Sequence, residues 1–252
     1  GTKILFLHGV AVSKSSWRTV MHNLCDKYHT IAVDVPGYNY SKDFPNMNYS
    51  LRSLSQWLES VVNSITTADE SLHLVGHSIA AGIAAYYSAS HPAKLKSLTL
   101  LNMPEMFCDP NVDLEKCKTD LSHLWVENPE EFKILMQHFF DSPPKIPEVL
   151  VKSYIKKMAD KRARFDRLLE DTCNSIPLLL PRMMQIKLPV LALTGSSDKY
   201  SPPDVLEKIK LAIPQAKTET FQKSGHLSVI ERPDAITNQL ENFIYNLPTN
   251  DN

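Results

Sequence analysis

Short apolar segments alternate with amphipathic ones along most of the chain. The apolar segments have the length of buried β-strands, and the amphipathic ones repeat apolar residues at helical spacing. This alternation is typical of a parallel sheet with helices on both faces. The predicted strands are Lys3–Leu7, Thr30–Asp34, Leu72–Val75, Leu98–Leu101, Val190–Thr194 and Thr218–Phe221. The predicted helices are Ser16–Lys27, Leu51–Ile65, Ser78–Ser90, Pro203–Leu211 and Asp234–Tyr245.

The alternation stops from residue 104 to residue 187, where the pattern is helical and prolines gather at positions 143, 144 and 147. An insertion of this length between two strands must lie above the sheet edge. We therefore predict an α/β core formed by residues 1–103 and 188–252, with residues 104–187 inserted over it as a helical cap. Because the chain enters a strand at Lys3, we also expect that a segment before Gly1 was removed or is absent.

Composition adds mainly exclusions. The chain has 252 residues, of which 43% are hydrophobic and 22% charged, and its net charge is −1. That length supports one sizeable domain or a domain with an inserted subdomain. The chain has no Lys/Arg-rich run of the kind that would indicate a nucleic-acid partner, so we expect none. The apolar runs are shorter than the roughly 18 residues of a membrane span, and no signal peptide is recognisable.

The cysteines do not predict a metal or redox site. Cys25, Cys108, Cys117 and Cys173 are scattered without CxxC spacing, which favours a reducing compartment. We expect no metal and no organic cofactor. The sequence determines neither the oligomeric state nor the location, for which we expect the cytoplasm or a membrane-associated place.

The stretch Gly76-His77-Ser78-Ile79-Ala80 places one serine between a predicted strand and a predicted helix. A serine at such a turn is held in a strained conformation that raises its hydroxyl above the sheet edge, the nucleophile elbow. Small neighbours are needed because the two backbones nearly touch there. The usual pattern ends in glycine where this chain has alanine. Ser78 as a plain helix cap is the alternative.

A serine needs a base within hydrogen-bond reach, and the base needs a group that orients it. His226 is the predicted base, because it follows the last strand in a loop directly after Gly225. Asp198 is the predicted orienting acid, because it follows another strand after a turn at Gly195. Asp204 competes with it but suits the first turn of a helix better.

The predicted oxyanion hole consists of backbone amides. Val10 follows the first strand after His8-Gly9, and Ile79 directly follows the serine. Two N–H groups at these places can hold the negative oxygen of a tetrahedral intermediate.

These motifs together resemble those of the α/β-hydrolase superfamily, in the same order and over nearly the whole chain. The C-terminal run from Lys223 to Pro233 is most similar to the monoacylglycerol lipase branch. That branch includes a membrane-associated member whose cap is similar in length. In the superfamily one or two strands usually precede the His-Gly strand, and this chain lacks them. The motifs that carry the resemblance are His8-Gly9, Asp34-Val35-Pro36-Gly37, Gly76-His77-Ser78, Gly195 with Asp198, and Gly225-His226.

Apolar side chains in and beside the inserted segment suggest a pocket for a hydrocarbon chain. One helical stripe contains Phe132, Leu135, Met136, Phe139 and Phe140, and the plainer interpretation is that it packs the cap on the core. Flexible methionines suit an irregular lipid-like ligand. The predicted substrate-binding residues are Met103, Met106, Phe107, Trp125, Phe132, Met136 and Phe139.

The resemblance implies a serine hydrolase that cleaves carboxylic esters through an acyl-enzyme on Ser78. Its implied substrate is a small apolar or lipid ester such as a monoacylglycerol. Hydrolases of carbon–carbon bonds use the same serine triad and stay open. Another class of alternative is a ligand receptor with the same fold and slow or single-turnover hydrolysis. The charged run Lys156–Arg164 predicts a solvated helix face, with peripheral membrane contact as the other interpretation.

Overall fold

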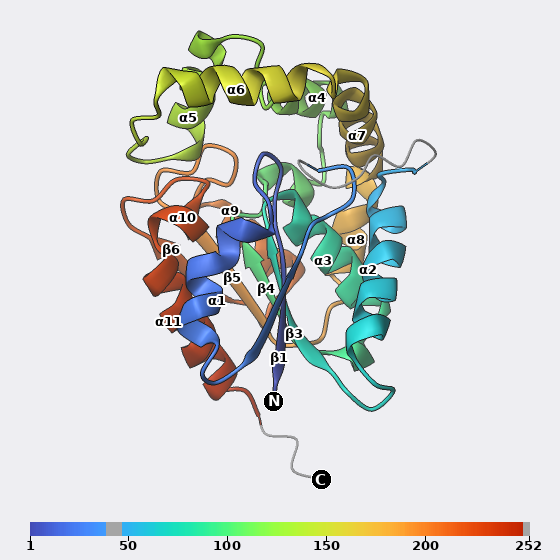
Figure 1. Cartoon of the computed structure of the whole chain (residues 1–252). Coiled ribbons are helices and arrows are strands. Elements are labelled where there is room, and N and C mark those ends of the chain that lie inside the picture. The colour runs from blue at the N-terminus through green and yellow to red at the C-terminus, as the bar shows by residue number, and fades with distance from the viewer. Residues whose placement is uncertain (39–46, 249–252) are drawn as a thin grey trace.

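The computed structural model describes residues 1–38 and 47–248, and its centre is a parallel sheet (Figure 1). The spatial order of the strands is β2-β1-β3-β4-β5-β6, and every neighbouring pair is parallel. The predicted parallel sheet with helices on both faces is confirmed. The strands are β1 Lys3–Leu7, β2 His29–Val33, β3 Leu72–His77, β4 Leu95–Leu101, β5 Val190–Gly195 and β6 Lys217–Phe221.

Alternate residues of the central strands enter two separate hydrophobic cores. On β1, Leu5 and Leu7 face the larger core, whereas Ile4 and Phe6 face the smaller one. All four side chains are buried. Burial on both faces explains why these strands are continuous apolar runs.

Helices cover both faces of the sheet (Figure 1). Helices α1 and α11 pack together against the smaller core, and α2, α3 and α9 contribute to the larger one. The α-helices of the two layers are α1 Arg18–Leu24, α2 Leu51–Ile65, α3 Ile79–Ser90, α9 Val205–Ala212, α10 Ser228–Glu231 and α11 Pro233–Tyr245. Short 3₁₀ helices occupy η1 Lys14–Trp17 and η2 Pro92–Lys94.

Element boundaries follow the sequence closely, with two exceptions. Strand β4 begins at Leu95 and not at the predicted Leu98. The predicted helix Ser16–Lys27 is divided into η1 and α1 and ends at Leu24. Helix α2 has the predicted bounds, and the hydroxyl of Ser50 accepts a hydrogen bond from the Ser53 amide at its start. This side-chain cap is a common helix start.

Residues between β4 and β5 form the inserted helical segment. Helices α4 to α7 lie beyond the carboxyl ends of the strands, and α8 returns beside α3 (Figure 1). The division into a core and a cap stays a prediction. Over the described residues, no helix has both the length and the apolar character for a bilayer crossing. The elements are η3 Glu105–Cys108, α4 Leu114–Ser122, α5 Pro129–Phe139, α6 Glu148–Ala159, α7 Arg162–Ser175, η4 Ile176–Leu178 and α8 Leu179–Met183.

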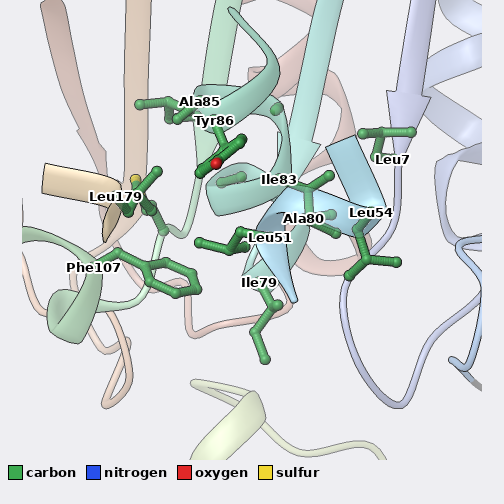
Figure 2. Close-up of a cluster of buried hydrophobic side chains, with 14 of the residues drawn as sticks. Leu7, Leu51, Leu54, Ile79, Ala80, Ile83, Ala85, Tyr86, Phe107 and Leu179 are labelled. Carbon is green, nitrogen blue, oxygen red and sulfur yellow. The ribbon is translucent and has the colours of Figure 1, made fainter. Parts of the chain in front are cut away.

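Helix α3 is buried along most of its length, which explains its small side chains. Figure 2 shows Phe107 and Leu179 packed beside it. A Cβ atom at Gly82 would lie 2.7 Å from the Phe107 ring. The Phe107 side chain therefore fills a place in the core that glycine leaves open.

Candidate active site

The turn between β3 and α3 holds Ser78 in a strained backbone conformation. Its φ is 58° and its ψ is −131°, which is rare for a residue with a side chain. A Cβ atom at Gly76 would lie 2.5 Å from the Ala80 carbonyl oxygen and 2.8 Å from Ala81 Cα. Only glycine fits there, whereas the structure accommodates the methyl group of Ala80.

The structure brings the three predicted catalytic side chains into one hydrogen-bonded chain. The Ser78 hydroxyl lies 2.8 Å from His226 Nε2. His226 Nδ1 lies 3.0 Å and 2.9 Å from the two carboxylate oxygens of Asp198. All three residues are buried. Because Nδ1 faces a carboxylate, it carries the proton and leaves Nε2 free to accept the hydroxyl proton.

Four donors surround the Asp198 carboxylate. Besides His226, the Asn102 side-chain amide donates to Oδ2 over 2.7 Å, and the Tyr200 and Ser201 amides donate to Oδ1 over 2.9 Å. Burial alone would raise the pKa of Asp198 and is the largest single influence. The charge and hydrogen bond of His226, together with Asn102 and Ser201, outweigh it and hold that pKa below its ordinary value.

The competing acid lies elsewhere. Asp204 is the residue before helix α9, its side chain is 64% exposed, and its carboxylate lies 3.9 Å from Lys208. This is the place expected of an acid in the first turn of a helix.

Another histidine holds the loop that carries His226 through a hydrogen bond to its backbone. His77 Nε2 donates to the His226 carbonyl oxygen over 2.8 Å. Complete burial, and then the nearby His226, lower the pKa of His77 to about 3, so its ring is neutral. The rings of Phe139 and Tyr200 contact the His226 imidazole, with centroids 5.8 Å and 5.1 Å away.

The predicted oxyanion donors lie on either side of the serine. Ile79 begins α3, and the loop with Gly9 and Val10 follows β1. A Cβ atom at Gly9 would lie 2.7 Å from Ser78 Cβ, so this loop runs directly beside the nucleophile. Within residues 1–38 and 47–248, neither the Val10 nor the Ile79 amide donates a hydrogen bond. Their role as an oxyanion hole stays a prediction.

Two apolar cavities share lining residues, because Val10 and Leu124 border both. The first is also lined by Ser78, Ile79, Pro104, Leu121, Phe139, Tyr200 and His226. The second is also lined by Ala11, Gly37, Tyr38, Trp125, Met158, Lys161, Arg164, Phe165 and Leu168.

The predicted substrate-binding residues are spread over several places. Phe139 lines the cavity at the serine, and Trp125 lines the second one. Met106 borders a larger polar cavity that also touches Tyr200. Phe132 and Met136 line a groove between α5 and α6. Met103 and Phe107 are buried among core residues, and the binding roles of all seven stay predictions.

One residue of the apolar stripe lies outside its helix. Helix α5 ends at Phe139, and Phe140 is extended with φ −120° and ψ 144°. The Phe139 carbonyl oxygen accepts a hydrogen bond from the Leu227 amide, so this end of the helix is tied to the loop of the catalytic histidine.

Sequence reasoning missed Asn102, Leu121 and Tyr200, whereas it counted Leu124 among the apolar residues near the suggested pocket. Asn102 directly follows β4, so the carboxyl ends of neighbouring parallel strands were a usable signal for it. Leu121 and Tyr200 carried no such signal.

Metal ligands do not cluster in the part of the chain that the structure describes. The four cysteines are free thiols, and three of them are buried.

Comparison with known proteins gives consistent matches. The profile of the alpha/beta hydrolase fold family matches residues 3–143 and 149–233. A monoacylglycerol lipase of Xenopus laevis is 25% identical over 99% of this chain and 77% of its own length. Lipase 3 of a Moraxella species is 23% identical over 96% of this chain and 77% of its own. The crystal structure of a membrane phospholipase A, a bacterial virulence factor, has a TM-score of 0.85 at 24% identity, covering 98% and 79% of the two chains.

Proposed function

Because the chain belongs to the alpha/beta hydrolase fold family, we propose that it cleaves carboxylic esters through an acyl-enzyme on Ser78. The predicted family and fold are confirmed, as is a hydrolase of the lipase and esterase type. The hydrogen-bonded chain Ser78–His226–Asp198 is the observation that carries the proposal.

Acylation begins at Ser78. Its Oγ attacks the ester carbonyl while His226 Nε2 takes the hydroxyl proton. Asp198 stabilises the imidazolium, and the Val10 and Ile79 amides hold the developing oxyanion. As the carbonyl re-forms, the bond to the alcohol oxygen breaks and His226 returns the proton to it. The alcohol leaves, and the acyl group stays on Ser78.

Deacylation repeats these steps with water. His226 Nε2 removes a proton from the water as its oxygen attacks the acyl carbonyl. Collapse of this intermediate releases the carboxylic acid and returns the proton to Ser78. No step needs a metal or an organic cofactor.

The substrate that these cavities support best is a small lipid ester. Apolar side chains line most of the space at Ser78 and its neighbouring cavity, which suits a hydrocarbon chain. Similarity to the monoacylglycerol lipase of Xenopus laevis supports a monoacylglycerol. We propose that residues 104–187 act as the cap that covers this chain.

Labelling with a fluorophosphonate probe tests the proposed nucleophile. The wild-type protein should react, and peptide mass spectrometry should locate the adduct on Ser78. Ser78→Ala should not react, although its circular dichroism spectrum should match that of the wild type. Labelling of another serine, or none in the folded wild-type protein, would overturn the proposal.

A further inference from the structure

The Glu231 carboxylate joins two segments that are far apart in the sequence. Its Oε2 accepts a hydrogen bond from the Gly225 amide over 2.6 Å. Its Oε1 accepts from the Asp141 amide over 2.9 Å and from the Ser142 amide over 3.3 Å. One oxygen therefore holds the residue before His226, and the other holds the chain just beyond α5.

A carboxylate suits this place because both oxygens must accept. An ionised Glu is an acceptor only, with about four lone-pair sites. Hydrogen bonds from N–H groups to a charged oxygen are stronger than neutral ones. Within residues 1–38 and 47–248, Glu231 forms no ion pair. Its carboxylate is therefore stabilised by hydrogen bonds from backbone amides.

Further contacts tie the same two segments together. The Leu227 amide donates to the Phe139 carbonyl oxygen over 2.9 Å. The Phe139 ring stacks on the His226 imidazole with an angle of 23° between the planes. A Cβ atom at Gly225 would lie 2.7 Å from the Phe139 carbonyl oxygen, so the two backbones touch.

We propose that Glu231 is a positioning residue that couples the end of α5 to the loop of His226. The imidazole then reaches Ser78 only while the end of α5 is in place. A substrate that displaces the inserted helices therefore also acts on the geometry of the base. This inference rests on the proposed role of His226 as the base.

Replacing the Glu231 carboxylate by an amide removes the acceptor from one of its two links, the one to Gly225 or the one to Asp141. In Glu231→Gln, one oxygen becomes an NH₂ group that faces an N–H donor, so either the Gly225 side or the Asp141 side loses its acceptor. With a short ester, we expect kcat to fall about tenfold while KM changes by less than twofold. Glu241→Gln is the matched control, because the Glu241 carboxylate pairs with Lys27 at the surface. Its kcat should equal that of the wild type.

Hydrogen–deuterium exchange provides a readout that does not depend on the reaction. Glu231→Gln should accelerate exchange of peptides covering residues 139–143 and 223–227 together, whereas Glu241→Gln should accelerate neither. Glu231→Asp, which keeps the charge but shortens the reach, should give a smaller loss of kcat. If Glu231→Gln does not fold, Glu231→Asp carries both measurements.

The outcomes separate this inference from the proposed function. An unchanged kcat, or faster exchange in one segment alone, would overturn the coupling. Should the wild-type protein lack esterase activity while exchange rises in both segments, the coupling would stand and the proposed reaction would fail.

Discussion

Asn102 directly supports Asp198, because its side-chain amide donates a 2.7 Å hydrogen bond to Asp198 Oδ2. Asn102 holds a left-handed backbone conformation with φ 48°, which asparagine tolerates better than most residues. Its backbone N–H follows the end of β4 and donates a hydrogen bond to the Leu193 carbonyl oxygen of β5. The position of the Asp198 carboxylate therefore depends on residues that follow both β4 and β5.

Loss of the Asn102 side-chain amide should impair His226 as a base, because Asp198, which orients His226, loses a hydrogen bond. In Asn102→Gly the backbone conformation is retained and the donor is lost, so we expect kcat for a short ester to fall about tenfold, or roughly 1.4 kcal/mol. Asn102→Ala should show the same loss and unfold at lower denaturant concentration, since alanine disfavours positive φ. Steady-state kinetics and urea unfolding measure the two effects. Equal stability of the two variants would contradict the strain argument.

The Ser78 conformation predicts a conflict between stability and activity. Both Ser78→Ala and Ser78→Gly should be inactive, because both lack the nucleophile. Ser78→Gly should be more stable than Ser78→Ala by about 1 kcal/mol, since glycine relieves the strain of a side chain at φ 58°. Chemical denaturation of the pair measures this difference. A less stable glycine variant would count against stored strain at the turn.

Buried histidines predict that stability falls in mild acid. Burial lowers the pKa of His73 from 6.5 to about 4 and that of His77 to about 3, so both stay neutral in the folded protein. The unfolded chain binds these protons first as pH falls below 6.5. The free energy of unfolding should therefore decrease from pH 6.5 to 4.5 by up to about 1.4 kcal/mol per pH unit for each residue.

His73→Gln isolates one of these contributions. His73 bonds Ser97 near the start of β3, away from the catalytic serine. Urea unfolding of this variant between pH 6.5 and 4.5 should show a shallower decrease than the wild type. Parallel curves would mean that His73 is not kept neutral by the fold.

Leu124 borders both apolar cavities, so we expect its size to set the acyl length that the site accepts. Leu124→Trp should reduce kcat/KM for long-chain esters at least tenfold and leave acetyl esters within about twofold. Leu211→Trp is the control, because Leu211 is 82% exposed on α9. A uniform loss over all chain lengths would place the acyl chain elsewhere.

The sequence predicted the sheet and the three polar side chains because each lies on a strong local pattern. Continuous apolar runs are typical of strands buried on both faces. Ser78 and Asp198 each follow such a run, whereas the strand before His226 is mostly polar, and Gly225 marks that histidine instead. Those signals are local, so one sequence is enough to find them.

The surroundings of the site depend on packing that no local pattern contains. Asn102 acts on Asp198 because β4 lies beside β5, and only the strand order shows this. Phe107 has the apolar character of a pocket residue, but Gly82 leaves room for it in the core. An apolar stripe indicates burial without saying whether a cavity or the core lies opposite.

The number of product molecules released per active site tests the central claim most directly. With a short chromogenic ester in large excess, the wild-type protein should release hundreds of equivalents, and Ser78→Ala should release none above background. Release that stops after about one equivalent would contradict an ester hydrolase and favour a receptor that retains its acyl group.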